Sequence, residues 1–216
     1  DTPLSEGIDR TEWLRSMLVQ PALFIRIRRD RDKLLRILAD SQIHATLITE
    51  SCISLPNGAK IDALLPPDSY VVQDASSQQT GNYFNPKKGE SWYDCCAGAG
   101  GKSLLLKDME EGVSLTVSDR RESILHNLKE RFRLYGHKPP KACITDVANP
   151  KQLSDALGDT KFDNIICDAP CSGSGTWART PEQMYFFNPG TLPAFSSLQK
   201  EIATNVAAYL KPGGRL

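Results

Sequence analysis

From about residue 67, apolar segments typical of strands alternate with helical segments, and this alternation limits the possible folds more than any other feature. The expected strands are residues 92–96, 115–118, 142–145 and 162–167, and the expected helices are residues 102–110, 121–135, 153–157 and 195–210. Strand–helix alternation at this spacing builds βαβ units and a parallel, doubly wound sheet. The sequence therefore predicts an α/β domain over residues 67–216.

Residues 1–66 follow a different pattern. Residues 9–12 (Asp-Arg-Thr-Glu) have the form of a capping box that opens a short helix, with Pro21 as its end. A strand at 22–28, a helix around 34–38 and a strand at 45–49 are expected next. Pro66-Pro67 is typical of a boundary. We predict a small α+β unit over residues 1–66.

The charge and cysteine content exclude several classes of protein. Lys+Arg and Asp+Glu are both 26, so any surface for nucleic acid must come from local clustering. The first ten residues are polar and no apolar run reaches the length of a membrane span. The 6 cysteines and 3 histidines are scattered, without the spacing of metal ligands. We expect a cytoplasmic, reduced protein that binds neither membrane nor metal.

The most informative segment is residues 93–103 (YDCCAGAGGKS), which joins an expected strand to an expected helix. Its glycines allow a sharp turn and close approach of the backbone to a ligand. Gly101-Lys102-Ser103 resembles the end of a P-loop, but Cys96 stands where that loop needs glycine. A dinucleotide loop would need its third glycine elsewhere. An S-adenosylmethionine loop, in which an acidic residue ends the strand before Gly98-x-Gly100, fits better.

Aspartates at the ends of successive strands support this interpretation. Asp119 ends the next strand, where a carboxylate can accept hydrogen bonds from both ribose hydroxyls. Asp146 follows the third strand and could reach the adenine amino group. A single aspartate at such a place is as often a helix cap or a turn residue. Here three successive strands end in an aspartate beside a glycine loop (Asp94, Asp119 and Asp146), and this favours a cofactor site.

Residues 168–175 (DAPCSGSG) follow the fourth strand, at the sheet edge where open α/β sheets bind their ligands. Carbon 5 of cytosine accepts a methyl group only after a thiolate has added at carbon 6, which makes Cys171 a candidate catalytic residue. Asp168 could hydrogen-bond the ring nitrogen and keep it protonated. Lys102 or a helix N-terminus could supply the positive surroundings that a thiolate needs. The alternative for Cys171 is a small buried side chain.

These motifs resemble the NOL/NOP/Sun family of RNA cytosine-5 methyltransferases over residues 22–216. Residues 73–78 are similar to the family's entry into the catalytic domain, residues 94–102 to its cofactor loop, and residues 168–175 to its Asp-Ala-Pro-Cys-Ser-Gly signature. The resemblance implies a Rossmann-like S-adenosylmethionine methyltransferase domain after a small RNA-recognition-like domain. It also implies methylation of carbon 5 of a cytosine in RNA, with ribosomal RNA favoured, transfer RNA second, and a monomeric enzyme.

The resemblance assigns roles residue by residue. The implied cofactor residues are Cys96, Ala97, Gly98, Ala99, Gly100, Gly101, Lys102, Asp119, Asp146 and Asp168. The family usually has Ala-Pro where Gly98-Ala99 stands here. In the family, Cys171 would assist product release, while the nucleophile is a Thr-Cys pair on the following strand. No such pair occurs in this sequence, so we expect it beyond residue 216, with the C-terminal strands of the domain.

A basic stretch in the first unit is the candidate RNA surface. Arg26, Arg28, Arg29 and Arg31 stand close together there, and placed in an RNA-recognition-like unit they could contact phosphates. Candidates for stacking on bases are Tyr83, Phe84, Trp177, Tyr185, Phe186 and Phe187. Two other functions stay open at this point: a P-loop-like nucleotide-binding protein, and an inactive RNA-binding module with the methyltransferase fold.

Overall fold

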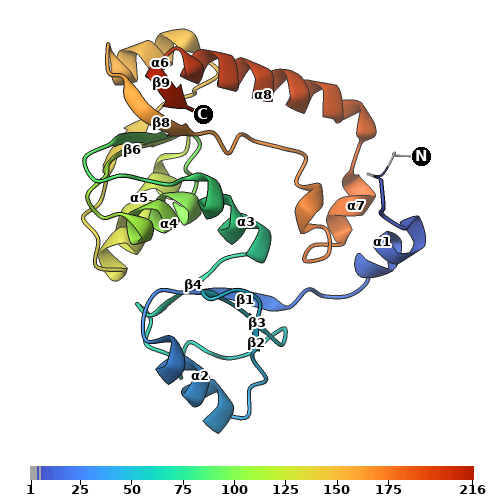
Figure 1. Cartoon of the computed structure of the whole chain (residues 1–216). Helices are drawn as coiled ribbons and strands as arrows, with labels where there is room; N and C mark the ends of the chain where they lie inside the picture. Colours follow the sequence, from blue (N-terminus) through green and yellow to red (C-terminus); the bar gives the residue numbers. More distant parts are fainter. Residues whose placement is uncertain (1–3, 5) are drawn as a thin grey trace.

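The computed structural model describes residue 4 and residues 6–216, and these form two sheets that lie one above the other in Figure 1. Residues 1–3 and 5, which belong to the predicted first unit, lie outside the described residues. The smaller sheet has the strand order β2-β3-β1-β4, and the larger has the order β7-β6-β5-β8-β9.

The smaller sheet is antiparallel and carries one helix on its face. Its strands are β1 (Leu23–Ile27), β2 (Thr46–Leu47), β3 (Cys52–Leu55) and β4 (Tyr70–Val72), and the helix is α2 (Arg31–Asp40). Leu34 and Leu38 of α2 are buried against the sheet. Burial of each such leucine contributes about 1.5–3 kcal/mol.

Strand β4 lies beyond the predicted boundary at residues 66/67. It pairs with β1, Ile25 opposite Val72, so the first sheet continues to Val72. Pro66 lies in a tight turn, in which its carbonyl oxygen accepts hydrogen bonds from the amide and hydroxyl of Ser69 at 3.0 and 2.6 Å. The two prolines thus turn the chain back into the first sheet, and the predicted boundary divides that sheet.

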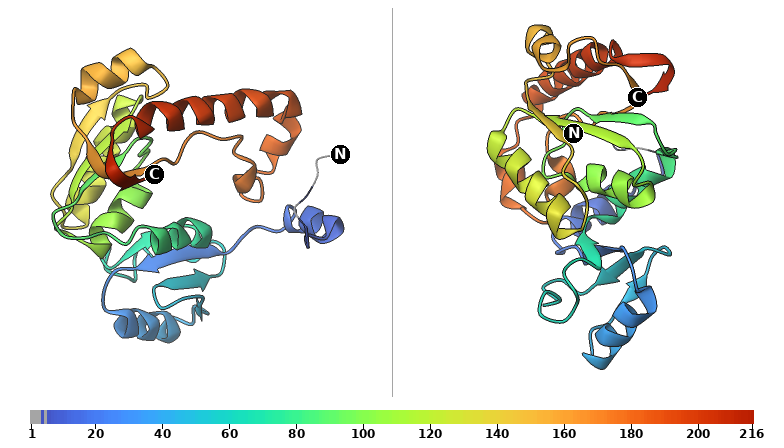
Figure 2. Two further views of the ribbon diagram at one scale, coloured as in Figure 1. Left: turned by 45° about the horizontal axis from the view of Figure 1, so that its top comes forward. Right: turned by 90° about the vertical axis from the view of Figure 1, so that its left-hand side faces the viewer.

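The N-terminal helix forms as expected but is not buried. Asp9 caps α1 (Arg10–Ser16) by accepting a 2.8 Å hydrogen bond from the Glu12 amide. The helix ends at Ser16, before Pro21, and none of its residues is buried. Leu14, and Leu18 beyond the end of the helix, are exposed. The segment extends away from the two sheets (Figure 2).

The larger sheet confirms the predicted doubly wound α/β fold. Its strands β5 (Ser91–Asp94), β6 (Ser114–Asp119), β7 (Lys141–Ile144), β8 (Phe162–Ile166) and β9 (Leu210–Arg215) are all parallel. Helices α4 (Gly101–Met109) and α5 (Glu122–Leu134) bury leucines on one face. On the other face, α6 (Pro150–Leu157) buries two leucines, and α8 (Leu192–Ala207) buries Ile202 and Val206. The strand order changes direction between β5 and β8, where such sheets bind ligands.

The last strand begins earlier than predicted. Helix α8 ends at Ala207, and residues 211–214 (Lys-Pro-Gly-Gly), expected to precede a strand, lie inside β9. Leu210 pairs with Phe162 and Arg215 with Asn164, with a shift of register between them. Because proline has no amide hydrogen and Gly213 has a φ of +79°, this segment bulges while its ends stay paired.

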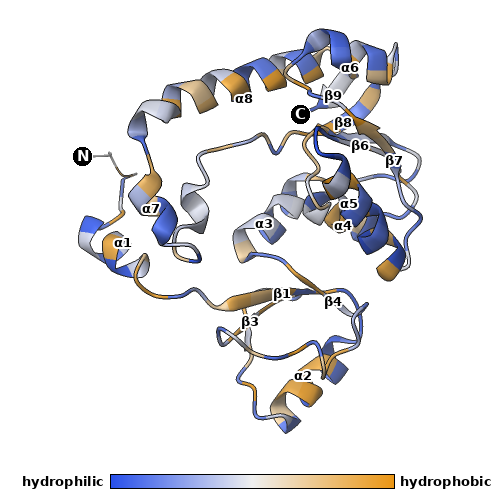
Figure 3. Cartoon of the chain, turned by 180° about the vertical axis from the view of Figure 1, so that it is seen from behind, coloured by the Kyte–Doolittle hydropathy of each residue, from blue (hydrophilic) through white to orange (hydrophobic). Residues whose placement is uncertain are grey.

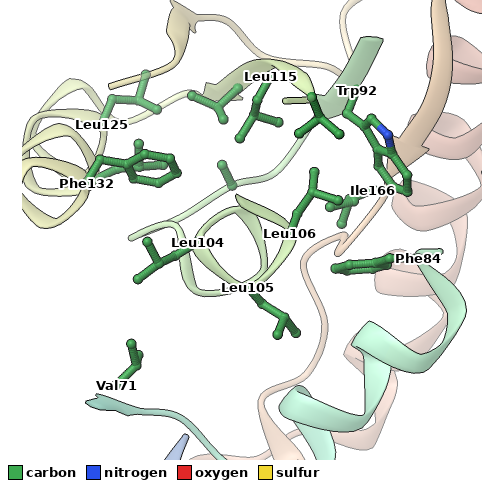
Figure 4. Close-up of a cluster of buried hydrophobic side chains, with 14 residues drawn as sticks. Val71, Phe84, Trp92, Leu104, Leu105, Leu106, Leu115, Leu125, Phe132 and Ile166 are labelled. Carbon is green, nitrogen blue, oxygen red and sulfur yellow. The ribbon is translucent and has the colours of Figure 1, made fainter. Parts of the chain in front are cut away.

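Helix α4 lies at the centre of the core that joins the two sheets. Leu104, Leu105 and Leu106 are all buried, and Val71 of β4 belongs to the same cluster (Figure 4). The short α3 (Ala75–Gln79) and the 3-10 turn η1 (Thr80–Tyr83) connect the sheets. The core of the larger domain therefore includes a side chain of the smaller sheet.

A long excursion separates β8 from α8. It contains η2 (Ser174–Thr176), α7 (Glu182–Phe186) and η3 (Pro189–Thr191), and α8 then returns to the sheet (Figures 1 and 2). The Arg179 guanidinium pairs with Asp74 at the start of α3. Coloured by hydropathy, α8 carries apolar and polar residues along its length (Figure 3).

Candidate functional site

The glycine loop turns the chain from β5 into α4. Gly98 and Gly100 both have left-handed backbones, with φ of +51° and +80°. A Cβ at Gly100 would lie 2.8 Å from Cγ of Leu128 on α5, whereas one at Gly98 would meet no atom within 4 Å. Gly100 is therefore required by its backbone and by the close approach of α5.

This requirement gives a stability prediction. Gly100→Ala is expected to lower the free energy of unfolding by about 2–4 kcal/mol, because backbone strain adds to overpacking against Leu128. Gly136 is the matched control, since its φ is +75° but a Cβ there would meet nothing within 4 Å. Gly136→Ala should cost only about 1–2 kcal/mol. Urea unfolding measures both, and equal losses would show that Leu128 makes room.

Five predicted cofactor residues surround one cavity at the carboxyl ends of the strands. The cavity has a volume of about 410 Å³, and its lining includes Cys96, Gly98, Asp119, Asp146 and Asp168. The lining also includes residues that the sequence did not suggest: Arg121, Thr145, Leu198 and Ile202. Sequence motifs from four strand ends thus converge in space.

The other predicted cofactor residues have different surroundings. Ala97 is buried in the core beside α4, and the Ala99 carbonyl accepts a 2.7 Å hydrogen bond from Arg131. Gly100 faces α5, and Gly101 is the first residue of α4. The Lys102 ammonium lies 2.5 Å from an Asp168 carboxylate oxygen. These five shape the loop but do not line the cavity.

Of the acidic residues that line the cavity, Asp119 accepts the most hydrogen bonds. Its carboxylate accepts hydrogen bonds from the Gly98 amide at 3.2 Å, the Arg121 amide at 2.9 Å and two guanidinium nitrogens of Arg121 at 2.9 and 3.0 Å. Partial burial opposes ionisation, but these hydrogen bonds outweigh it and lower the pKa of Asp119. Asp119 is therefore an ionised acceptor at neutral pH.

Two buried oxygen atoms near the loop have no hydrogen-bond partner. One is Oγ1 of Thr145, which lines the cavity just before Asp146. The other is Oδ1 of Asp94, whose Oδ2 accepts a 2.6 Å hydrogen bond from Ser103. Buried polar atoms are nearly always paired, so an orphan in a cavity wall points to a bound group. Asp146 itself also caps a turn, accepting a 3.0 Å hydrogen bond from the Ala148 amide.

Asp94 makes stability depend on pH. Complete burial raises its pKa from 3.8 to about 6, although the Ser103 hydrogen bond opposes the shift. The pKa of Asp94 is higher in the folded protein than in the unfolded one. Its contribution to the free energy of unfolding is therefore full below pH 3.8 and is lost as pH rises through about 6.

Replacing Asp94 by asparagine should remove this dependence. Relative to Asp94→Asn, the native protein is expected to lose about 1–3 kcal/mol of unfolding free energy as pH rises from about 4 to 7. Urea unfolding of both proteins across that range measures the difference. A difference that stays constant with pH would show that Asp94 titrates normally.

Cys171 is exposed, so the alternative of a small buried side chain was wrong. The carbonyl of the preceding Pro170 accepts a 2.9 Å hydrogen bond from Gln199 of α8, which holds this segment near the cavity. The Asp168 side chain is 57% exposed, and its carboxylate pairs with the Lys102 ammonium. The charge partner of Lys102 is thus Asp168, and no contact of Lys102 with the Cys171 thiol is seen.

Two of the four arginines predicted to contact RNA are not on the surface. The side chains of Arg26 and Arg28 are 5% and 8% exposed, and both pair with Asp108 of α4, at 2.7 and 2.6 Å. They join the two sheets, which corrects their placement on an RNA-facing surface. Arg29 and Arg31 are exposed, paired only with Asp68 and Asp32 near the surface.

The aromatic candidates also divide into two groups. Tyr83, Tyr185 and Phe186 are 83%, 87% and 73% exposed. Phe84 is buried in the core, and Trp177 packs edge-on against Phe187 with ring centroids 4.8 Å apart. Tyr185 and Phe186 also pack edge-on against each other, with ring centroids 5.3 Å apart, but both stay largely exposed.

Comparison with known proteins places this site in a family. The sequence profile of the family "16S rRNA methyltransferase RsmB/F" matches residues 82–216, which is more than half of the chain. The chain belongs to this RsmB/F family. The match begins before the glycine loop and includes every acidic residue around the cavity, so the predicted family resemblance is confirmed.

Individual relatives agree. Ribosomal RNA small subunit methyltransferase B of Vibrio vulnificus is 33% identical over 191 residues, covering 87% of this chain and 44% of that protein. The protein of the same name from an Enterobacter species is 28% identical over 204 residues, covering 91% and 47%. The chain spans about half the length of these relatives. NSun6 from Pyrococcus horikoshii, solved with SFG, shares the fold, with a TM-score of 0.80 at 14% identity over 94% of this chain and 77% of that one.

Among residue 4 and residues 6–216, no helix combines the length and apolarity needed to cross a membrane. Within the same residues, no group of three or more His, Cys, Asp or Glu side chains could hold a metal ion.

Proposed function

We propose that this chain is the cofactor-binding part of an enzyme that transfers a methyl group from S-adenosylmethionine to carbon 5 of a cytosine in RNA, with ribosomal RNA as the favoured substrate. The observation that carries the proposal is the single cavity around Gly98, Asp119, Asp146 and Asp168, at the carboxyl edge of an RsmB/F-family sheet. The substrate class rests on the family and on the names of its ribosomal relatives.

The cavity residues fit this cofactor. Asp119 is an ionised acceptor suited to the two ribose hydroxyls, and the unpaired Oγ1 of Thr145 lies beside Asp146, near the expected adenine position. Leu198 and Ile202 of α8 supply an apolar wall. The Arg121 side chain that now covers Asp119 is 59% exposed, so it can turn into solvent when ribose binds.

The bound cofactor supplies an electrophilic methyl group. Asp168 would bind the target ring by a hydrogen bond that holds a proton on the cytosine nitrogen, which requires its carboxylate to exchange the Lys102 partner for the base. The exposed Cys171 thiol would assist departure of the methylated base. The ring must leave its stack to reach this edge of the sheet.

RNA would approach from the exposed cations of the smaller sheet. Arg29 and Arg31 line a depression together with Lys33, and we place phosphate contacts there. Tyr83, Tyr185 and Phe186 offer ring faces for unpaired bases.

Disrupting the gene that encodes this chain is expected to remove 5-methylcytosine from one position of small-subunit ribosomal RNA. Mass spectrometry of nuclease digests of ribosomal and transfer RNA measures the change. Complementation with the native gene should restore the base, and complementation with Asp168→Asn should not. Loss confined to transfer RNA would reassign the substrate, and unchanged 5-methylcytosine in both RNAs would contradict the proposal.

The P-loop alternative has a separate test. Calorimetry should detect binding of adenosylmethionine and of adenosylhomocysteine to the protein, but no binding of ATP with Mg²⁺. Cys96 stands where a phosphate-binding loop needs glycine, and it lines the cavity instead. Binding of ATP without either adenosyl compound would reverse this assignment.

A further inference from the structure

Three thiols gather where β5 and β8 end beneath the glycine loop. Asp94 pairs with Ile166 across these strands, and the Cys95 amide donates a 3.0 Å hydrogen bond to the Ile166 carbonyl. Cys95 and Cys167 are the next residues of the two strands, and Cys167 packs against the buried cluster that contains Cys95. Neighbouring parallel strands lie about 4.8 Å apart, within the range of Cα separations that disulfides bridge.

We propose that Cys95 and Cys167 are a peroxide-sensitive thiol pair whose oxidation to a disulfide closes the cofactor cavity. This inference goes beyond the proposed methyl transfer, which uses neither sulfur atom.

The two thiols differ in access and acidity. Cys167 is half-buried and lines a second cavity of about 300 Å³ together with Lys102, whereas Cys95 is 1% exposed. The neighbouring Cys95 thiol lowers the pKa of the Cys167 thiol, against the opposing effects of burial and of the carboxylates of Asp94 and Asp168. The Cys167 sulfur in turn raises the pKa of Cys95, which keeps its proton. Cys167 is therefore the reacting thiolate.

The chemistry balances with hydrogen peroxide as the oxidant. The Cys167 thiolate attacks one peroxide oxygen, becomes a sulfenic acid and releases hydroxide, which takes a proton to become water. The Cys95 sulfur then loses its proton and attacks the sulfenic sulfur, expelling a second water. Two thiols and one peroxide give one disulfide and two waters.

The third thiol, that of Cys96, could compete with Cys167 for a disulfide with Cys95. Sγ of Cys96 lies 4.0 Å from Sγ of Cys95, but a bond between adjacent residues would have to distort the peptide that joins them. Cys95 and Cys167 need no such change, since their strands already run side by side.

The disulfide would act on the cofactor site through the next residue of each strand. Cys96 follows Cys95, Asp168 follows Cys167, and both line the cavity. A covalent S–S bond is only about 2.0 Å long, shorter than any contact between separate sulfur atoms, so its formation pulls the Cys95 and Cys167 side chains together and shifts the residues that follow them. We expect narrowing of the cavity and weaker binding of cofactor.

Peptide mapping tests the bond itself. After peroxide treatment and blocking of free thiols, an endoproteinase that cuts before aspartate separates residues 94–107 from 163–167 and also separates Cys167 from Cys171. The expected product joins 94–107 to 163–167, persists in Cys96→Ala, and disappears after reduction. Cys143→Ala, which removes a half-buried thiol of β7, should leave it unchanged. Absence of this product in Cys96→Ala, or a bond between Cys95 and Cys96 in the native protein, would overturn the proposal.

Calorimetry with adenosylhomocysteine tests the consequence. In Cys171→Ala, which excludes oxidation of the exposed thiol, peroxide should weaken binding roughly tenfold and dithiothreitol should restore it. In the double variant that carries both Cys171→Ala and Cys95→Ala, peroxide should cause no such reversible loss of affinity. If the disulfide is mapped but the affinity for adenosylhomocysteine does not change, the proposed closing of the cofactor cavity is wrong. Failure of the reduced native protein to bind would instead count against the proposed function and leave the mapping result intact.

Discussion

Asp108→Ala is expected to lower the free energy of unfolding by about 3–5 kcal/mol, because it leaves two buried arginines without their carboxylate. The Asp108 side chain is 12% exposed and pairs with Arg26 and Arg28, while His137 lies 2.7 Å from the same carboxylate. Without Asp108, Arg26 would keep its 3.0 Å hydrogen bond to Gln73, but its charge would lie buried without a carboxylate, and one of its guanidinium nitrogens already lacks a partner among the described residues. Urea unfolding measures the loss.

The matched control is Asp155→Ala, which removes an exposed carboxylate paired with Lys151 on α6. That pair lies in solvent, and its loss should cost well under about 1 kcal/mol. Comparable losses for the two variants would show that Asp108 is not an essential partner of the buried arginines.

The effect of Asp108 should also depend on pH in a defined direction. Burial opposes ionisation, but the hydrogen bond from Arg28 and the charge of Arg26 lower the pKa of Asp108 below 3.8. Its stabilising contribution is therefore full above pH 3.8 and is lost as pH falls through the folded value. The difference between the native protein and Asp108→Ala should narrow in acid.

Asp119→Ala is expected to weaken binding of S-adenosylmethionine by about 10–100-fold, because it removes an ionised acceptor for the ribose hydroxyls. Calorimetry with adenosylhomocysteine measures the change. Asp119 also accepts a hydrogen bond from the Gly98 amide, so a loosened loop could weaken binding by itself.

Arg121→Ala tests whether the Arg121 guanidinium competes with ribose for Asp119. It removes the guanidinium that competes with ribose for Asp119 but leaves the Asp119–Gly98 hydrogen bond in place. Affinity should stay unchanged or rise by a few-fold. If Arg121→Ala weakens binding as much as Asp119→Ala, then the Arg121–Asp119 pair supports the cofactor site, and Arg121 does not compete with ribose.

The parallel sheet could be predicted because short segments rich in apolar residues alternate with helical segments, and several of the expected strands end at or just before an aspartate. The carboxyl ends of parallel strands meet at one edge, so Asp119, Asp146 and Asp168 were predicted to converge, and they line one cavity. Strands β3 and β4 were missed because they contain only four and three residues. Strand β9 was placed too late because local rules for Pro212 and Gly213 were outweighed by pairing with β8.

The remaining differences come from contacts between distant parts of the sequence. The alternation of residues 22–28 predicts that Arg26 and Arg28 face solvent, but Asp108, 80 residues beyond Arg28, buries both of them. Thr145 carries no motif, and its importance follows only from an unpaired hydroxyl oxygen in the cavity wall. Arg121 likewise became a site residue only when its guanidinium was found on Asp119.

The place of β4 in the first sheet decides where this chain can be cut. A protein that starts at residue 67 would keep β4 but lose β1, the strand with which β4 pairs. It would also leave Asp108 without both of its arginine partners. Attempts to produce residues 67–216 alone should therefore yield aggregates, whereas expression from residue 22 onward, which retains both sheets, should yield soluble protein.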